Sequence, residues 1–221
     1  MKRLHLLLFG LALVLSFAIF SRYINRGGLK EIDFAVTVKL QERIDTSSRL
    51  RLASITGDVM EGSSILASPL VSVIAITVIT ITTFIKRKKY RTATLIIPIV
   101  FGFMILAEIY GKSVVHHPAP PFFLLKNPTS IFPKYYVWED FSYPSGHAAR
   151  AIFLTMLLGY TMKKRIWIMA SLILFVILIS VSRIYLGHHW LSDVIGGLIL
   201  GSGSGLLTIS ILLSYNRKRN E

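Results

Sequence analysis

Histidine, lysine, arginine and aspartate side chains gather in three short segments of this sequence. The segments are residues 112–120 (KSVVHHPAP), 143–147 (YPSGH) and 182–193 (SRIYLGHHWLSD). Histidine can attack an electrophile or transfer protons near neutral pH, and fixed cations bind anionic groups. Because phosphoryl transfer depends on positioning and on stabilisation of negative charge, these residue types point to chemistry on a phosphate.

One histidine–carboxylate pair has the spacing of a single helical turn. His189 and Asp193 are four residues apart, so on a helix they share a face. The carboxylate can then accept a hydrogen bond from one imidazole nitrogen and leave the other nitrogen available. This arrangement prepares His189 as a nucleophile. His147 is the candidate that carries a proton to a leaving group.

The remaining polar residues predict a binding site for the phosphate itself. Ser145 and Gly146 precede an apolar segment, where Ser145 can cap a helix whose first N–H groups bind an anion. Lys112 and Arg183 stand at the ends of two other apolar segments. Either cation alone could extend toward lipid headgroups. Together with the helix N-terminus they favour a phosphate cradle.

Long apolar blocks separate the three segments. The residue types AVILMFWYC make up 53% of the 221 residues and DEKR only 16%, whereas a soluble domain of this length carries more charge. Blocks of this length are typical of membrane helices. We predict an all-α bundle of six transmembrane helices forming one domain, residues 1–221. The expected spans are approximately 4–20, 63–85, 92–110, 148–162, 166–186 and 194–215.

Two segments near the N-terminus allow alternatives. The first span could be a signal peptide, but its exit at residues 20–22 lacks a small-residue cleavage site, which favours a retained helix. Residues 29–51 mix apolar and charged side chains, and we predict an amphipathic helix at the membrane surface. That helix could line the lipid, act as a lid or simply connect two spans. Close helix packing is expected in the sixth span at Gly197, Gly201, Gly203 and Gly205.

The cations predict the orientation in the membrane. The formal net charge is +14. Six spans with the N-terminus inside place the basic clusters at 2–3, 86–91, 163–165 and 217–219 on one side, which the positive-inside rule assigns to the cytoplasm. Both termini are then cytoplasmic, and the three polar segments lie on the extracytoplasmic face of the cell membrane. No nucleic-acid-binding motif accompanies the charge, so nucleic acid is not an expected partner.

The three segments resemble the signature motifs of the type 2 phosphatidic acid phosphatase (lipid phosphate phosphatase) superfamily, in its bacterial membrane-bound branch. Those motifs are K-x6-R-P, P-S-G-H and S-R-x5-H-x3-D. The second matches at 144–147 and the third at 182–193. The likeness extends over essentially the whole chain beyond the first span. The first motif departs, because Ala119 stands between Lys112 and Pro120 where the family has arginine.

The resemblance implies a lipid phosphate phosphatase that uses neither a metal nor another cofactor. In this family the histidine of the third motif attacks phosphorus, a role that carries over to His189, with Asp193 stabilising its imidazolium. His147 would protonate the leaving group and then activate water. The phosphate oxygens would be held by Lys112, Ser145, Gly146 and Arg183. Substrates implied by the family are undecaprenyl diphosphate, phosphatidylglycerol phosphate and phosphatidic acid.

Loss of one phosphate-binding arginine costs on the order of a hundredfold in rate. Arg150 lies three residues beyond His147, and we predict that its guanidinium fills the space left at Ala119. The alternative is that Arg150 pairs with Glu139, Asp140 or a headgroup.

Other functions compete with hydrolysis. With Ala119 in the first motif, the chain could be a lipid-phosphate binding or transport protein with reduced or lost turnover. Haloperoxidases share the motifs, which raises oxidation chemistry with bound vanadate, although membrane spans disfavour it. The histidine spacings match no familiar zinc hydrolase, and Lys112 and Arg183 would repel a dication. We expect His116, His117 and His188 to pack at a surface or interface.

The loop before the second motif is rich in aromatic residues. It contains Phe122, Phe123, Tyr135, Tyr136 and Trp138, which predicts a position at the level of the lipid headgroups. The expected partners are the bilayer and a lipid phosphate. The sequence indicates neither the physiological lipid nor the oligomeric state.

Overall fold

The computed structural model describes residues 2–46, 50–86, 91–126, 141–162 and 165–217. Its elements there are helical, as predicted. The α-helices are α1 (Lys2–Asn25), α2 (Lys30–Asp45), α3 (Leu50–Leu66), α4 (Pro69–Lys86), α5 (Ile96–Val114), α6 (Gly146–Thr161), α7 (Ile166–Tyr185) and α8 (Leu191–Arg217). Two short 3-10 helices cover Arg91–Leu95 and Phe122–Leu124.

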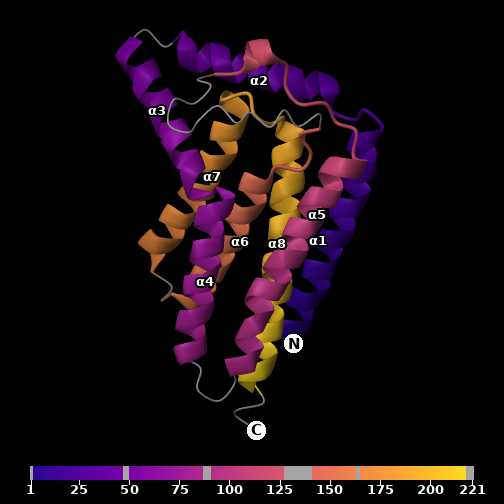
Figure 1. Cartoon of the computed structure of the whole chain (residues 1–221), viewed down its shortest axis with the longest axis vertical. Coiled ribbons are helices and arrows are strands. Elements are labelled where there is room, and N and C mark those ends of the chain that lie inside the picture. Colours follow the sequence, from indigo (N-terminus) through magenta and orange to yellow (C-terminus); the bar gives the residue numbers. More distant parts are fainter. Residues whose placement is uncertain (1, 47–49, 87–90, 127–140, 163–164, 218–221) are drawn as a thin grey trace.

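The long helices form an elongated bundle, and α2 crosses one end of it (Figure 1). Five helices in the described part are long and apolar enough to cross a membrane: Arg3–Asn25, Pro69–Lys86, Thr92–Val114, Ile166–Tyr185 and Leu191–Tyr215. The remaining predicted span, 148–162, corresponds to α6, which has only 16 residues, whereas a crossing helix needs about 20. The all-α fold is therefore confirmed, and the count of six spans stays a prediction.

The second predicted span, 63–85, is wrong as a continuous helix. The structure ends α3 at Leu66 and begins α4 at Pro69. A proline inside a helix lacks the N–H that the preceding turn requires, but it is favourable in the first turn. The break leaves the carbonyl of Ala67 available to another helix, and Ala67 itself is fully buried.

The helix α2 has a polar inner face. Asp33, Thr37 and Gln41 are buried at intervals of four residues, while Ile32 and Phe34 are about half exposed. A four-residue interval places the three polar side chains on one side of the helix. The predicted amphipathic segment 29–51 is divided, since α2 ends at Asp45 and α3 begins at Leu50. Its position at the membrane surface stays a prediction.

The apolar core lies between α4, α5, α6 and α8. Its members include Ile76, Phe101, Phe153 and Leu200, and the rings of Phe101 and Phe153 are 5.7 Å apart between centroids. The predicted close packing of the last helix is confirmed. A Cβ at Gly197 or Gly201 would collide with backbone carbonyl groups of α6, so these glycines let the two helices approach each other.

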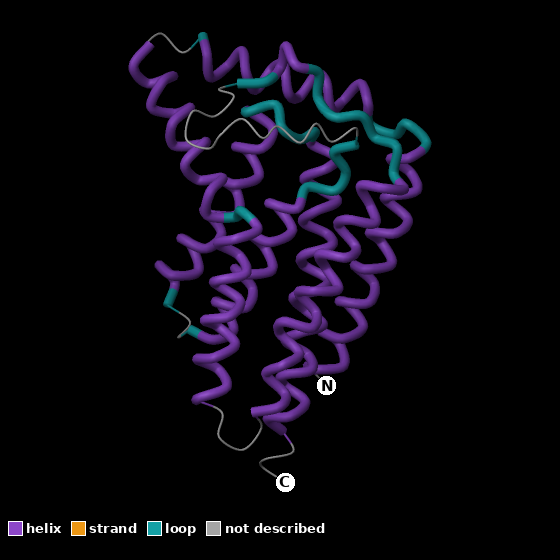
Figure 2. The backbone as a smooth tube through the Cα atoms, viewed as in Figure 1, coloured by secondary structure: helices purple, strands orange, loops and turns teal. Residues whose placement is uncertain are grey.

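The polar segments all come to the same end of the bundle. Most of the loops, drawn in teal in Figure 2, lie at the end of the bundle where α5 and α7 end and α6 and α8 begin. The helix α1 begins and α8 ends at the opposite end (Figure 1). This arrangement agrees with the predicted separation of termini and site. The assignment of either end to the cytoplasm stays a prediction, and residues 87–90, 163–164 and 218–219 of the basic clusters lie outside the described residues.

Candidate active site

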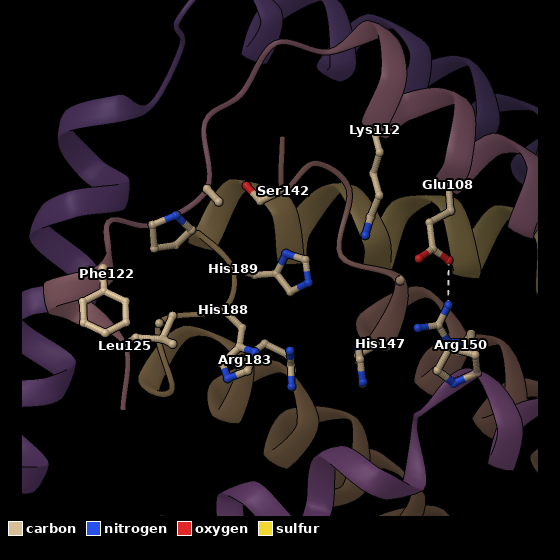
Figure 3. A pocket seen from close by; sticks show the side chains of 15 residues that line it. Glu108, Lys112, Phe122, Leu125, Ser142, His147, Arg150, Arg183, His188 and His189 are labelled. Atoms are coloured by element: carbon tan, nitrogen blue, oxygen red, sulfur yellow. Dashed lines mark hydrogen bonds and ion pairs between the residues drawn. The ribbon is translucent and has the colours of Figure 1, made fainter. Parts of the chain in front are cut away.

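A cavity of about 330 Å³ lies at the end of the bundle where α5, α6 and α7 meet. Six of the eight predicted site residues line it, and Figure 3 shows most of them around the central His189. These six are Lys112, Gly146, His147, Arg150, Arg183 and His189. Three cations and two histidines from distant parts of the chain thus share one space. Ser145 and Asp193, the other two predicted residues, are buried and are not among the residues that line it.

Helix ends position the side chains. The helix α5 continues to Val114, beyond the predicted end at 110, so Lys112 lies in its last turn. Arg183 occupies the last turn of α7, and Gly146 and His147 begin α6. Cations are favourable at helix C-termini, and the first turn of a helix offers N–H groups to an anion. The ends of three helices therefore supply one positively charged cavity.

A tight turn after α7 presents His188 and His189. The N–H groups of both histidines donate to the carbonyl of Arg183, each at 3.1 Å. Gly187 has a φ of 71°, a left-handed conformation that favours glycine. A Cβ at this position would also collide with the carbonyl of Leu124. Gly187 is therefore required for the turn that aims His189 into the cavity.

His189 is paired with Asp193 as predicted. The distance from Nδ1 of His189 to Oδ2 of Asp193 is 3.4 Å, at the long end for a hydrogen bond. The contact occupies Nδ1, so Nε2 is the nitrogen available for attack. Burial lowers the pKa of His189, Asp193 opposes this effect, and Arg183 and Lys112 reinforce it. A lowered pKa keeps the ring neutral and nucleophilic.

The carboxylate of Asp193 is fully buried and held from several sides. Oδ2 also accepts the backbone N–H of Trp190 at 2.9 Å. Since α8 begins at Leu191, Asp193 is its third residue and reaches back to the residue before the helix, as in one half of a capping box. Oδ1 lies 2.9 Å from Nδ1 of His117. These contacts fix the orientation of the carboxylate.

The prediction for His117 is wrong. Its side chain is 2% exposed and contacts Asp193, whereas His116 is exposed and packs against Phe141 as expected. Residues 115–118 alternate between buried and exposed, because the chain is extended after α5 and successive side chains point in opposite directions. His188 lines the cavity and is partly buried. Burial, with Arg183 nearby, lowers the pKa of His188 to about 2.

Ser145 occupies the predicted N-cap position of α6 but does not cap it with its side chain. Its Oγ is buried and has no hydrogen-bond partner among the described residues. The backbone N–H of Ser145 instead donates to the carbonyl of Asp193 at 2.9 Å, joining the starts of α6 and α8. Side-chain capping by Ser145 is therefore wrong, and phosphate binding by this residue stays a prediction.

The family model of the PAP2 superfamily matches residues 93–217, more than half of the chain. The chain belongs to the PAP2 superfamily. This confirms the resemblance noted from the motifs.

Relatives of this PAP2 chain carry phosphatase names. An undecaprenyl-diphosphatase of Sulfolobus acidocaldarius is 38% identical over 127 residues, 57% of each chain. A phosphatidylglycerophosphatase B of Bacillus subtilis is 32% identical over 90 residues, 36% of this chain and 41% of the relative. The chain thus spans about half the length of these relatives.

Two solved structures share the fold. The PAP2-type phosphatidylglycerolphosphate phosphatase of Bacillus subtilis superimposes with a TM-score of 0.66 at 22% identity, covering 95% of this chain and 96% of that one. LpxE of Aquifex aeolicus gives a TM-score of 0.52 at 23% identity, covering 80% and 96%. The likeness therefore extends to the helices before residue 93, which the family model does not include.

This PAP2 chain holds Arg150 in an ion pair that the sequence did not reveal. Nη1 of Arg150 lies 2.7 Å from Oε2 of Glu108, and Nε donates to the carbonyl of Ala67 at 3.1 Å. The predicted alternatives, Glu139 and Asp140, lie outside the described residues. Arg150 and Ala119 both line the cavity. That the guanidinium of Arg150 takes the place of the arginine missing at Ala119 stays a prediction.

Glu108 also lies against the start of α6. A Cβ on Gly146 would collide with its carboxylate, so only glycine fits there. A carboxylate at a helix N-terminus is favourable. The sequence carried a signal for this residue, since a charge in an apolar span almost always pairs with another, and Arg150 is the matching charge in α6.

Proposed function

We propose that this PAP2 protein is a membrane lipid phosphate phosphatase that acts through a phosphohistidine at His189. The single observation that carries the proposal is the cavity in which Lys112, Arg183 and His147 surround His189 (Figure 3). The carboxylate of Asp193 contacts Nδ1 of His189 at 3.4 Å. The phosphatase names of the relatives support the same reaction class.

The first step forms a nitrogen–phosphorus bond. Nε2 of His189 attacks the phosphorus of the lipid, and the bond from phosphorus to the leaving oxygen breaks. His147, protonated when a phosphate dianion lies beside it, gives its proton to that oxygen. Asp193 stabilises the positive charge that develops on the imidazole. Lys112 and Arg183, with the N–H groups that begin α6, hold the oxygens of the phosphoryl group.

The second step returns the protein to its starting state. The neutral His147 accepts a proton from a water molecule, and the water oxygen attacks phosphorus. The nitrogen–phosphorus bond breaks, inorganic phosphate leaves, and His189 regains its lone pair. None of these steps calls for a metal or another cofactor.

The apolar part of the cavity wall suits a substrate that keeps its tail in the bilayer. Phe122, Leu125, Pro69 and Pro120 line the cavity beside the cations, and Phe122 is 68% exposed. In this proposal the site faces the extracytoplasmic surface of the cell membrane. Undecaprenyl diphosphate and phosphatidylglycerol phosphate are the first substrates to test, because relatives are named for them. Phosphatidic acid is the third.

The test is phosphate release by the purified protein in detergent, with chelator present, from each of these three lipids. We expect turnover of at least one lipid and none after His189→Ala. His116→Ala is the matched control, because it removes an exposed histidine outside the cavity. A requirement for added metal, or normal turnover by His189→Ala, would refute the histidine mechanism.

The second candidate is a lipid-phosphate binding or transport protein with reduced turnover. The observation in its favour is Ala119, which leaves the cavity without the arginine of the first motif. Saturable binding of a lipid phosphate that never releases inorganic phosphate would establish this function instead.

A further inference from the structure

His117 lies between two buried carboxylates. Its Nδ1 is 2.9 Å from Oδ1 of Asp193, and its Nε2 is 3.6 Å from Oδ2 of Asp33. All three side chains are 2% exposed or less. Each ring nitrogen of His117 thus faces one of the two carboxylates. The three groups therefore form a continuous row from α2 to the start of α8.

Asp33 is joined to α8 by two further contacts. Its Oδ1 accepts the backbone N–H of Ser192 at 2.8 Å, and its Oδ2 accepts the Ser192 hydroxyl at 2.7 Å. The N–H groups in the first turn of a helix have no partner within it, so Asp33 caps α8 from another helix. Burial raises the pKa of Asp33, and the contacts with Ser192 and His117 oppose this effect. Ser192 is the neighbour of Asp193 in the chain.

The row formed by Asp33, His117 and Asp193 ends at His189, the proposed nucleophile. One oxygen of Asp193 contacts His117 and the other contacts His189. The contact of Oδ1 with His117 and the N–H of Trp190 on Oδ2 together restrain the rotation of this carboxylate. Loss of His117 would remove one of these two restraints and loosen the alignment of Asp193 with His189.

We propose that Asp33 and His117 are positioning residues for the nucleophile, and that they act by fixing Asp193 in the orientation that aligns His189. The inference rests on the proposed phosphatase function and extends it. In this inference α2, which crosses the end of the bundle (Figure 1), helps to align the attacking histidine. Neither Asp33 nor His117 lines the cavity, so neither contacts the phosphate.

A purely structural role is a poor explanation of this row. Buried ionic groups carry a desolvation cost, and well-packed apolar residues often replace them without loss of stability. Mutation of the outer partners of metal-binding side chains, in contrast, typically lowers metal affinity or activity by about tenfold to a hundredfold, and we expect a loss on the same scale for the outer partners of a reactive histidine.

The experiment compares His117→Ala, His117→Asn and Asp33→Asn with the parent protein. The readouts are kcat, KM and the inhibition constant of inorganic phosphate, which reports on the cationic cavity without needing the nucleophile. For His117→Ala we expect kcat to fall by about tenfold to a hundredfold, with little change in KM or in phosphate inhibition. His117→Asn keeps a side-chain N–H that can reach Asp193, so it should recover part of kcat. His116→Ala is the matched control, because it alters the exposed neighbour.

A double variant tests whether Asp33 acts through His117. If it does, Asp33→Asn lowers kcat in the parent and has little further effect in His117→Ala, because residues in one network are not additive. Asn still accepts the N–H of Ser192, so the cap of α8 is retained.

Two outcomes would overturn the inference. One is a kcat for His117→Ala within about twofold of the parent, well short of the loss expected for an outer partner. The other is a weakening of phosphate inhibition in proportion to kcat, which would indicate a damaged cavity. If His117→Ala does not fold, His117→Asn and Asp33→Asn decide by the same criteria. A parent protein that releases no phosphate from any lipid would instead refute the proposed function.

Discussion

Glu108 and Arg150, on neighbouring helices, form a buried ion pair at 2.7 Å on the wall of the proposed active site. The pair places a negative charge beside the first turn of α6, where the phosphate is expected to bind. A bound phosphate would therefore compete with Glu108 for the same positive groups. The pair both holds Arg150 in place and limits its contact with substrate.

Removing one member of this pair should destabilise the protein. Glu108→Ala leaves a buried guanidinium without its carboxylate, and such a change costs about 3 to 5 kcal/mol. Thermal unfolding in detergent measures the loss. Inorganic phosphate should raise the unfolding midpoint more in Glu108→Ala than in the parent, because the anion replaces the missing charge. An equal shift in both proteins would contradict competition between Glu108 and phosphate.

The substitution of Arg150 for the missing arginine can be tested by exchange. If the guanidinium of Arg150 binds phosphate, Arg150→Lys should lower kcat/KM by about tenfold or more, since lysine lacks the planar fork. Adding Ala119→Arg to that variant should restore part of the loss. An unchanged kcat/KM in Arg150→Lys would show that Arg150 serves only the pair with Glu108.

The pH dependence of kcat/KM should report the environment of His189. Attack requires the neutral ring, and burial lowers the pKa of His189 below its ordinary value. The ring thus stays neutral as the pH falls below about 6.5, and activity is lost only at lower pH. Because Lys112 contributes to the lowering, Lys112→Gln should move the acid limb upward. The profile is corrected for ionisation of the substrate phosphate, and an acid limb unmoved by Lys112→Gln would count against this assignment.

The turn after α7 should tolerate no side chain at its glycine. Gly187→Ala combines a positive φ with a collision against Leu124, so it should cost about 1 to 3 kcal/mol of stability and displace His189. Gly102→Ala is the matched control, because nothing lies within 4 Å of a Cβ there. Unfolding midpoints and kcat should fall only for Gly187→Ala. Equal behaviour of the two variants would show that the turn adapts.

Sequence reasoning succeeded where the relevant information is local. The four-residue spacing of His189 and Asp193 predicted their contact, although His189 lies in the turn before α8 and not on a helix. Polar residues at the ends of apolar spans predicted which helix ends would meet. Six of the eight predicted residues accordingly line one cavity. The glycines of the last span predicted close helix packing, and the structure shows that α6 is one of the helices they approach.

Sequence reasoning failed where the environment of a residue depends on segments that are distant in the chain. His117 is buried between Asp33 and Asp193, and neither spacing nor composition connects α2 with this segment. The break at Pro69 was overlooked because the surrounding hydropathy is uniform. Glu108 is a charge within an apolar span, but its partner is identified only once α5 and α6 are placed together.

The break between α3 and α4 bears on how far this protein can be divided into exchangeable parts. The recognisable PAP2 region begins at residue 93, yet the carbonyl of Ala67 that holds Arg150 and the wall residue Pro69 come from before it. Transplanting residues 93–217 onto a different set of N-terminal helices would remove both. The 92 residues before the family region thus have to be kept together with the motifs, and a chimaera must preserve Pro69 and the buried carbonyl of Ala67 to retain an intact site.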